Sequence, residues 1–199
     1  METTAVIDLM FFFIIPLWMA WGVVDYLCHR ASDIQHTTGA KESLMHLAMF
    51  AEAGTGLVLA MMFEINALVI ALLMVLLALH EVTGWWDIGY ATGKRHITDV
   101  EQHAHSFLEV LPFAALLLLL VIHWGQFLAL FGAGPETASW ALQWKTPPLP
   151  VAYVVTTLGA AVAIEIAPYI EELWRCLRTA QAQLVPPHPV RPTTRRQPS

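Results

Sequence analysis

Three segments of the sequence repeat one arrangement, an acidic residue followed four positions later by a histidine. The pairs are Asp25–His29, Glu42–His46 and Glu101–His105. Four residues make slightly more than one helical turn, so the two side chains of each pair lie on one helix face, about 40° apart. Iron, manganese and zinc take carboxylate and imidazole ligands where no thiolate is present. The three pairs therefore predict helices that direct nitrogen and oxygen ligands at one centre.

Other polar residues extend this pattern within apolar sequence. Glu109 continues the Glu101–His105 stripe by one turn, and Asp87 follows His80 by seven residues. His103 joins the cluster only if the first turn of its helix is irregular, because it points about 160° away from His105. We expect direct metal ligands at His29, Glu42, His46, His80, Glu81, Glu101, His105 and Glu109. We expect deeper ligands, supporting residues or proton relays at Asp25, Glu52, Asp87, His103 and Glu165.

The composition indicates that these residues lie in a membrane protein. Of the 199 residues, 57% are apolar and only 13% charged, whereas soluble domains carry about a quarter charged residues. The mean hydropathy is +0.57. Five apolar segments are long enough to cross about 30 Å of hydrocarbon, namely 5–27, 44–63, 67–83, 101–131 and 150–173. The predicted fold is an all-α bundle of five transmembrane helices without internal repeats.

Local signals mark some of the helix ends. Glu64, Ile65 and Asn66 form a polar break between the second and third segments. Thr98 and Glu101 have the spacing of a capping box, in which each side chain binds a free backbone amide of the first turn. The long fourth segment is expected to begin outside the lipid.

The positive charges predict the orientation of the bundle. If the helices alternate in direction, nine of the ten lysines and arginines fall on one side, and only Lys145 falls on the other. The positive-inside rule makes the first side cytoplasmic and places the N-terminus outside. We expect residues 1–182 to form the transmembrane unit, in the cytoplasmic (inner) membrane of the cell, with the metal cluster on its cytoplasmic side. Residues 183–199, rich in proline and arginine, are predicted to be a disordered cytoplasmic tail.

Helical rise predicts the depth of the polar residues. Counted inward at 1.5 Å per residue, Asp25, His46, His80 and His105 lie about 5 to 9 Å inside the bundle. Glu52, Glu109 and Glu165 lie about 15 Å inside, on three helices. Charged groups at such depth face the protein interior and are paired or coordinating. Two such layers could hold one or two metal ions. Glu171 and Glu172, near Arg175 at the end of the fifth segment, are expected to be solvated.

These features favour a membrane-embedded non-haem metalloenzyme. Carboxylates and histidines pooled from several helices are the pattern of di-iron bundles. The arrangement is similar to that of integral-membrane di-iron hydroxylases and desaturases, although their HxxxH and HxxHH histidine boxes do not occur here. That resemblance implies an iron cofactor, oxidation of a lipid or other apolar substrate with dioxygen, and a separate electron-donor protein. Manganese and zinc are alternatives to iron.

Two other functions fit the same residues. One is a transporter that carries a divalent cation or protons through the level of Glu52, Glu109 and Glu165. The other is a b-type haem protein, with haem held between His46 and His105. A net charge of −6 speaks against a nucleic-acid partner, and two cysteines cannot form a disulfide framework.

For the metalloenzyme, Glu109→Gln should abolish metal loading or activity, whereas His123→Ala should have only a mild effect.

Overall fold

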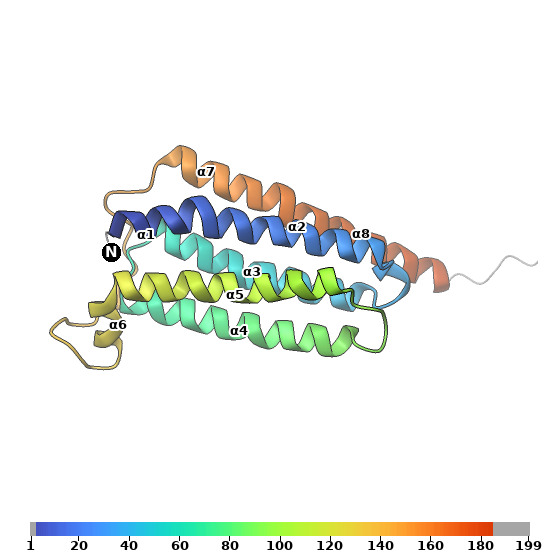
Figure 1. Cartoon of the computed structure of the whole chain (residues 1–199), viewed down its shortest axis with the longest axis horizontal. Helices are drawn as coiled ribbons and strands as arrows, with labels where there is room; N and C mark the ends of the chain where they lie inside the picture. Colours follow the sequence, from blue (N-terminus) through green and yellow to red (C-terminus); the bar gives the residue numbers. More distant parts are fainter. Residues whose placement is uncertain (1–2, 185–199) are drawn as a thin grey trace, which may run out of the picture.

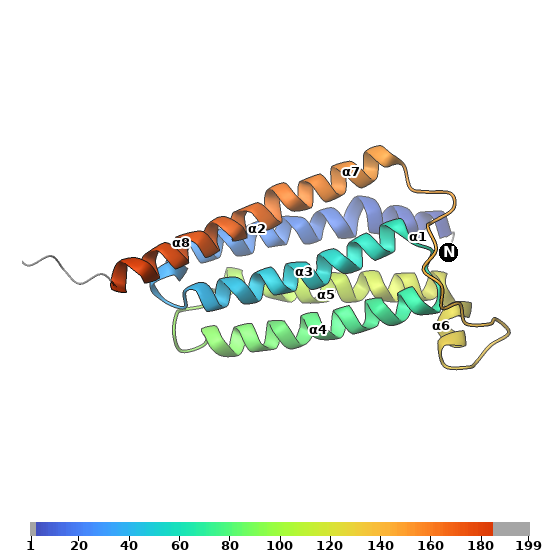
Figure 2. The same ribbon diagram turned by 180° about the vertical axis from the view of Figure 1, so that it is seen from behind.

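The computed structural model describes residues 3–184, and this part of the chain is helical without any β-strand. Five helical units are long and apolar enough to cross a membrane: Thr3–Ala31, Ala40–Met62, Ala67–Ala91, Asp99–Ile122 and Val151–Ala182. Figures 1 and 2 show them side by side along the long axis of the molecule. The prediction of an all-α chain with five membrane-length helices is confirmed. Most of the predicted tail, residues 185–199, lies outside the described residues.

The first and fifth units each contain a short π-helical segment. The first consists of α1 (Thr3–Leu9), the π-helical residues Met10–Ile14 and α2 (Ile15–Ala31). The fifth consists of α7 (Val151–Ala160), the π-helical residues Ala161–Ile166 and α8 (Ala167–Leu184). Such π-helical turns are rare in proteins, but those that occur often lie at functional sites.

The middle units are single α-helices. They are α3 (Ala40–Met62), α4 (Ala67–Ala91) and α5 (Asp99–Ile122). A short 3₁₀ turn, Ile34–His36, lies between α2 and α3. The five units form a closed ring, in which α2 packs on α5, α5 on α4, α4 on α3, α3 on α8, and the π-helical turn before α8 packs back on α2. Polar groups that face inward are therefore enclosed by helices on all sides.

The predicted starts of the helices are close to those observed, but three predicted ends are wrong: the third helix continues to Ala91 and not to residue 83, the fifth continues to Leu184 and not to residue 173, and the fourth is shorter than predicted. Asn66 begins α4 by accepting a hydrogen bond from the Val69 amide, and Thr98 and Glu101 form the expected capping box of α5. The fourth helix was predicted to continue to residue 131, but it ends at Ile122. His123 has φ −109° and ψ 37°, outside helical geometry, and the short α6 (Trp124–Leu130) follows as a separate element.

The outer surface of the bundle carries large apolar side chains. Examples on four different helices are Phe12, Val75, Val121 and Val155, which are 56% to 70% exposed. A soluble protein rarely exposes so many large apolar groups over its surface. The packed interior includes a cluster between α4 and α5, with Val69, Ile70, Leu116 and Leu120 among its members. This distribution is the one expected of helices surrounded by lipid.

The two ends of the bundle differ. One end holds α1, α6 and the segment 131–150, and the other holds the α2–α3 and α4–α5 connections and the projecting end of α8 (Figures 1 and 2). At the first end, the segment 131–150 crosses the turn between α3 and α4. The Lys145 amide donates to the Met62 carbonyl at 2.9 Å, and the Thr146 amide donates to Oε1 of Glu64 at 2.7 Å. These bonds hold Lys145 over the end of the bundle.

Candidate metal centre

Two of the three acid–histidine pairs meet between α2 and α5. Nε2 of His105 lies 3.0 Å from Oδ1 of Asp25, and Nε2 of His29 lies 3.5 Å from Oδ2 of Asp25. The same Nε2 atom of His29 lies 3.7 Å from Oε1 of Glu101. Asp25, His29, Glu101 and His105 are all buried, and each offers one ligand atom within 4.8 Å of the others. Asp25 therefore lies between two histidines and faces each with a different oxygen.

The ligand atoms of this group approach one another without forming hydrogen bonds. Oδ1 of Asp25, Nε2 of His29 and Nε2 of His105 have no hydrogen-bond partner among the described residues, whereas Oε1 of Glu101 is in ion-pair contact with Nη2 of Arg95. Buried polar atoms are normally paired. Ligands bound to one metal at about 2.1 Å lie about 3.0 to 3.4 Å apart at right or tetrahedral angles. The three shortest contacts in this group are 3.0, 3.5 and 3.7 Å, and one ligand atom from each of its residues lies within 4.8 Å of the others, so the group could bind a metal ion.

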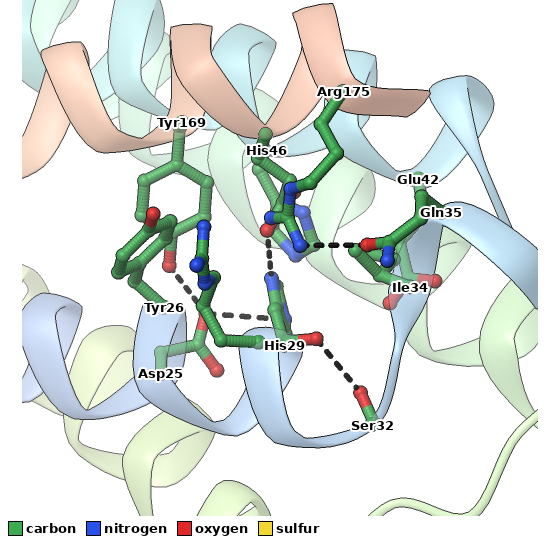
Figure 3. A network of polar contacts seen from close by, with 12 residues as sticks. Asp25, Tyr26, His29, Ser32, Ile34, Gln35, Glu42, His46, Tyr169 and Arg175 are labelled. Carbon is green, nitrogen blue, oxygen red and sulfur yellow. Dashed lines mark hydrogen bonds and ion pairs between the residues drawn. The ribbon is translucent and has the colours of Figure 1, made fainter. Parts of the chain in front are cut away.

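Two residues of α8, Tyr169 and Glu172, orient the group, and Figure 3 shows the first of them beside Asp25. Nδ1 of His29 lies 3.2 Å from Oε2 of Glu172, which is fully buried. A carboxylate that accepts the Nδ1 proton leaves the Nε2 lone pair of the same imidazole available to a metal. The hydroxyl of Tyr169 donates to Oδ2 of Asp25 at 2.8 Å. The fifth membrane-length helix thus supports ligands that α2 and α5 carry.

The third acid–histidine pair adjoins the first two through His29. His29, Glu42 and His46 form a second buried group of potential ligands, and the rings of His29 and His46 lie 4.3 Å apart between centroids. Nε2 of His46 also lies 3.2 Å from Oδ2 of Asp87 on α4. Because the two groups share His29, they form one connected cluster. We call it the histidine–carboxylate cluster, with members Asp25, His29, Glu42, His46, Asp87, Glu101 and His105.

Arg95, in the connection between α4 and α5, neutralises part of this cluster. Its Nη2 contacts Oε1 of both Glu42 and Glu101, and its side chain is only 1% exposed. Burial alone would lower the pKa of Arg95, but the hydrogen bonds and charges of Glu101 and Glu42 outweigh it and hold that pKa above its ordinary value. The guanidinium therefore stays charged. Arg95 is one of the basic residues at the positively charged end of the bundle. Its side chain, however, faces the protein interior and not the lipid headgroups.

The buried acids outnumber the buried basic side chains in the described part of the chain. Six acids are buried, namely Asp25, Glu42, Asp87, Glu101, Glu165 and Glu172, whereas the arginines that reach the interior are Arg95 and, with two of its guanidinium nitrogens, Arg175. Unpaired charges are expensive to bury. The excess negative charge must be offset by protons on the carboxylates, by protons on the buried histidines, or by bound cations. Several acids and imidazoles converging in this way are typical of a cation site.

A small cavity lies beside the cluster, toward the middle of the bundle. Its volume is about 60 Å³, and its polar lining consists of Asp25, His46, His80, Asp87, His105, Glu109 and Tyr169. On the far side of this cavity, Nδ1 of His80 lies 4.0 Å from Oε2 of Glu52. Oε1 of Glu52 accepts a hydrogen bond from Thr83 at 3.0 Å. The predicted deeper polar layer therefore includes a histidine as well as carboxylates.

Pro112 leaves one backbone carbonyl of α5 without its helical partner. A proline removes the amide that would bind the carbonyl four residues earlier, which here belongs to Leu108. Leu108 and His80 of α4 line the same small cavity. In a membrane helix such a freed carbonyl is satisfied by neighbouring helices, side chains or water.

The remaining predicted site residues lie apart from the two ligand groups. Glu109 lines the small cavity but belongs to neither group, and Glu81 is half-buried outside both. His103 is exposed on α5. Glu165 is 5% exposed in the π-helical turn, and neither of its oxygens has a hydrogen-bond partner among the described residues. It fits against α2 because Gly22 has no side chain, since a Cβ there would collide with the Glu165 carboxylate. Metal ligation by Glu81 and Glu109 stays a prediction.

Three residues of the site were not found from the sequence. Glu172 was expected to be solvated beside Glu171, but Glu172 is fully buried, whereas the Glu171 side chain is 41% exposed and pairs with Arg30. Tyr169 and Arg95 were not assigned to the site. Tyr169 follows Glu165 by four residues, a spacing that places both on one helix face. That spacing was the only available signal for Tyr169, since its partner Asp25 is 144 residues away.

The function has to be inferred from the geometry of the site, because comparisons with known proteins gave no match. No family model matches the chain, and neither the curated proteins nor the solved structures include a match to it.

Proposed function

We propose that the chain is a membrane-embedded metal-binding protein whose metal is held by Asp25, His29, Glu101 and His105. The observation that carries the proposal is the convergence of four buried ligand atoms within 4.8 Å of one another. Three of these atoms lack a hydrogen-bond partner among the described residues, and the fourth, Oε1 of Glu101, pairs with Arg95. Two further features support it. Glu172 holds the Nδ1 side of His29, and in the described part of the chain the six buried acids outnumber the buried basic side chains.

We further propose that the metal is iron and that a second ion binds in the small cavity. Imidazole and carboxylate ligands without thiolate suit iron, with manganese and zinc as alternatives. The cavity adjoins the first group, with which it shares Asp25 and His105, and His80 and Glu109 line it as well. Asp25 is suited to lie between two ions because its two oxygens face different directions. This arrangement would be a di-iron centre of the kind built in helix bundles.

The proposed reaction is oxidation of an apolar substrate. Non-haem iron supplies the activation of dioxygen. In a hydroxylation, one oxygen atom enters a C–H bond and the other leaves as water, with two electrons and two protons taken from a separate electron-donor protein and solvent. In a desaturation, two hydrogens leave the substrate and both oxygen atoms become water, with the same input. The chain's own residues orient the ligands, exclude water and hold protons, the last at the carboxylates that line the cavity.

Metal content of the purified protein tests the centre. We expect about two equivalents of iron in the intact protein and a large loss in Asp25→Asn and His105→Ala. His103→Ala is the matched control, because His103 lies on the same helix but is exposed. Metal content below a tenth of an equivalent after reconstitution with iron, manganese or zinc would contradict the proposal. So would equal metal content in His105→Ala and His103→Ala.

The two alternative functions receive less support. For transport, a polar path must continue beyond Glu52 and His80, but the residues that follow in the middle of the bundle, such as Leu73, Leu77 and Ala115, are apolar. For haem, a porphyrin must fit between His46 and His105, where the cavity is only about 60 Å³. A visible spectrum with a sharp Soret band would favour haem, and ion uptake by proteoliposomes would favour transport.

We propose that the cluster faces the cytoplasm in a cytoplasmic membrane. Arg30, Lys41, Lys94 and Arg175 lie at the cluster end of the bundle and Lys145 at the other, and the positive-inside rule then orients the chain. Single-cysteine variants of Ser139 and Lys94, in a chain without Cys28 and Cys176, test this. In intact cells, a membrane-impermeant thiol reagent should label the first and not the second.

A further inference from the structure

A second, larger cavity runs from the polar layer to the opposite end of the bundle. Its volume is about 430 Å³, within the range of pockets that bind small molecules. Trp18, Ala53 and His80 line both cavities, so the larger one begins where the smaller one ends. We call it the apolar cavity.

Small residues of α3 create this space. Ala53, Gly56 and Ala60 follow one another at spacings of three and four residues, so they lie on one helix face. Leu111 and Ala115 of α5 also line the cavity, next to Pro112. Small side chains at these positions leave space between the helices, and the other α3 residues that line it include Leu57 and Met61, so its walls are largely apolar.

The cavity is long and has polar groups at its two ends. On α3 its lining runs from Glu52 to Met61, a rise of about 14 Å at 1.5 Å per residue, and Glu64 lines it just beyond the end of the helix. Glu52 and His80 lie at the cluster end, and Glu64, His123 and Lys145 lie at the other. A long apolar space of this form fits an extended hydrocarbon chain with a polar group at one end better than it fits a compact ligand.

Lys145 supplies a cation at the mouth of the cavity. No carboxylate lies within ion-pair distance of its ammonium group in the described part of the chain, and Oε1 of the nearby Glu64 already accepts the Thr146 amide. Burial lowers the pKa of Lys145, an effect that the charge of Glu64 partly offsets. A partly buried ammonium group beside an apolar cavity is suited to bind the carboxylate of an amphiphile.

We propose that the apolar cavity binds a long-chain fatty acid, with its carboxylate at Lys145 and the far end of its chain beside His80. This orientation brings carbons remote from the carboxylate to the metal cluster. Oxidation of those carbons rests on the proposed function, but binding of the fatty acid does not. The two can therefore fail separately.

Photo-crosslinking tests binding directly. The probe is hexadecanoate with a diazirine at its methyl end, added to the metal-free protein in detergent. We expect labels near Trp18 and Ala53, mapped by mass spectrometry. Ala60→Trp should block this labelling, because it fills the cavity. Val58→Trp is the matched control, since Val58 is 39% exposed on the outer side of the same helix.

The headgroup contact has its own test. Lys145→Gln should weaken dodecanoate binding about tenfold, while dodecanol binding should change little because the alcohol carries no charge. Labelling spread over outward residues such as Val75 and Val121, and equal in Ala60→Trp and the intact protein, would overturn the proposal. So would labels confined to the Lys145 end. Labelling as expected in a protein that binds no metal would retain this inference and reject the metalloenzyme.

Discussion

The hydroxyl of Tyr169 lies 2.8 Å from Oδ2 of Asp25, and both side chains are buried. The same hydroxyl lies 3.3 Å from the Gly22 carbonyl, so α8 reaches across to two positions of α2 one turn apart. Asp25 would otherwise present both oxygens to histidines alone. The tyrosine therefore fixes how the carboxylate faces His29 and His105.

Removing this hydroxyl should weaken metal binding while keeping the fold. Tyr169→Phe retains the ring that packs on Phe50 and His46 and removes only the hydrogen bonds. Residues that support a metal ligand typically contribute 10- to 100-fold in affinity, and we expect a loss of about that size in a chelator competition assay. Tyr153→Phe, whose hydroxyl binds the Phe11 carbonyl at 3.2 Å in the other half of the bundle, should have ordinary affinity. Equal affinities of the two variants would exclude this role.

Glu172 and its neighbour Glu171 allow a closely matched comparison. Glu172→Gln removes the carboxylate that holds Nδ1 of His29, so the imidazole loses its fixed tautomer. We expect metal affinity to fall about 10- to 100-fold. Glu171→Gln changes an exposed residue that pairs with Arg30, and exposed ion pairs contribute little. An unchanged affinity in Glu172→Gln, measured by the same competition assay, would mean that His29 is oriented by other contacts.

Arg95 should contribute strongly to stability because it is buried between two carboxylates. Arg95→Gln leaves Glu42 and Glu101 buried without their cation, and breaking a buried pair in this way costs about 3 to 5 kcal/mol. Thermal unfolding of the metal-free protein in detergent should show a clear decrease in Tm. Lys94→Gln is the control, because Lys94 contacts only the Tyr90 ring at 3.1 Å and a cation–π contact contributes about 1 kcal/mol. Equal decreases would mean that Arg95 is not a buried partner.

The convergence of the three acid–histidine pairs followed from simple rules. Residues four apart share a helix face, charged faces in membrane helices point inward, and helices joined by short connections are antiparallel neighbours. Asp25, Glu42 and Glu101 therefore had to approach the same end of the bundle. The five helices followed from length and hydropathy in the same way.

The partners contributed by distant parts of the chain could not be predicted. Glu171 and Glu172 have the same chemistry and differ by about 100° of helix rotation, so only the packing of α8 on α2 and α3 decides which of them is buried. In the sequence, Arg95 resembles any other basic residue of a loop. None of the neighbouring residues indicates that it contacts Glu42 and Glu101. The apolar cavity could not be predicted from the sequence either, because small residues in a helix can indicate either close helix packing or an empty space between helices.

Binding of a fatty acid at Lys145 should depend on pH in a defined direction. Burial lowers the pKa of Lys145 below that of a free lysine, and only the protonated amine attracts a carboxylate. Affinity for dodecanoate should therefore be greatest below this lowered pKa and be lost as the pH rises through it. Lys145→Arg should extend binding to higher pH, because arginine stays charged. Dodecanol affinity should show no such loss, and parallel pH profiles for both ligands would contradict the role of Lys145.

A substitution of Glu109 tests whether the protein binds one metal ion or two. It lies outside the group of Asp25, His29, Glu101 and His105 but lines the small cavity with His80 and His105. Glu109→Gln keeps the size of the side chain and removes a charge that a second cation in this cavity requires. We expect metal content to fall from about two equivalents to about one, with activity lost and the helical content unchanged by circular dichroism. His123→Ala, at the far end of α5, should keep both ions. If Glu109→Gln keeps two ions while His123→Ala loses one, the second ion lies at the other end of the bundle.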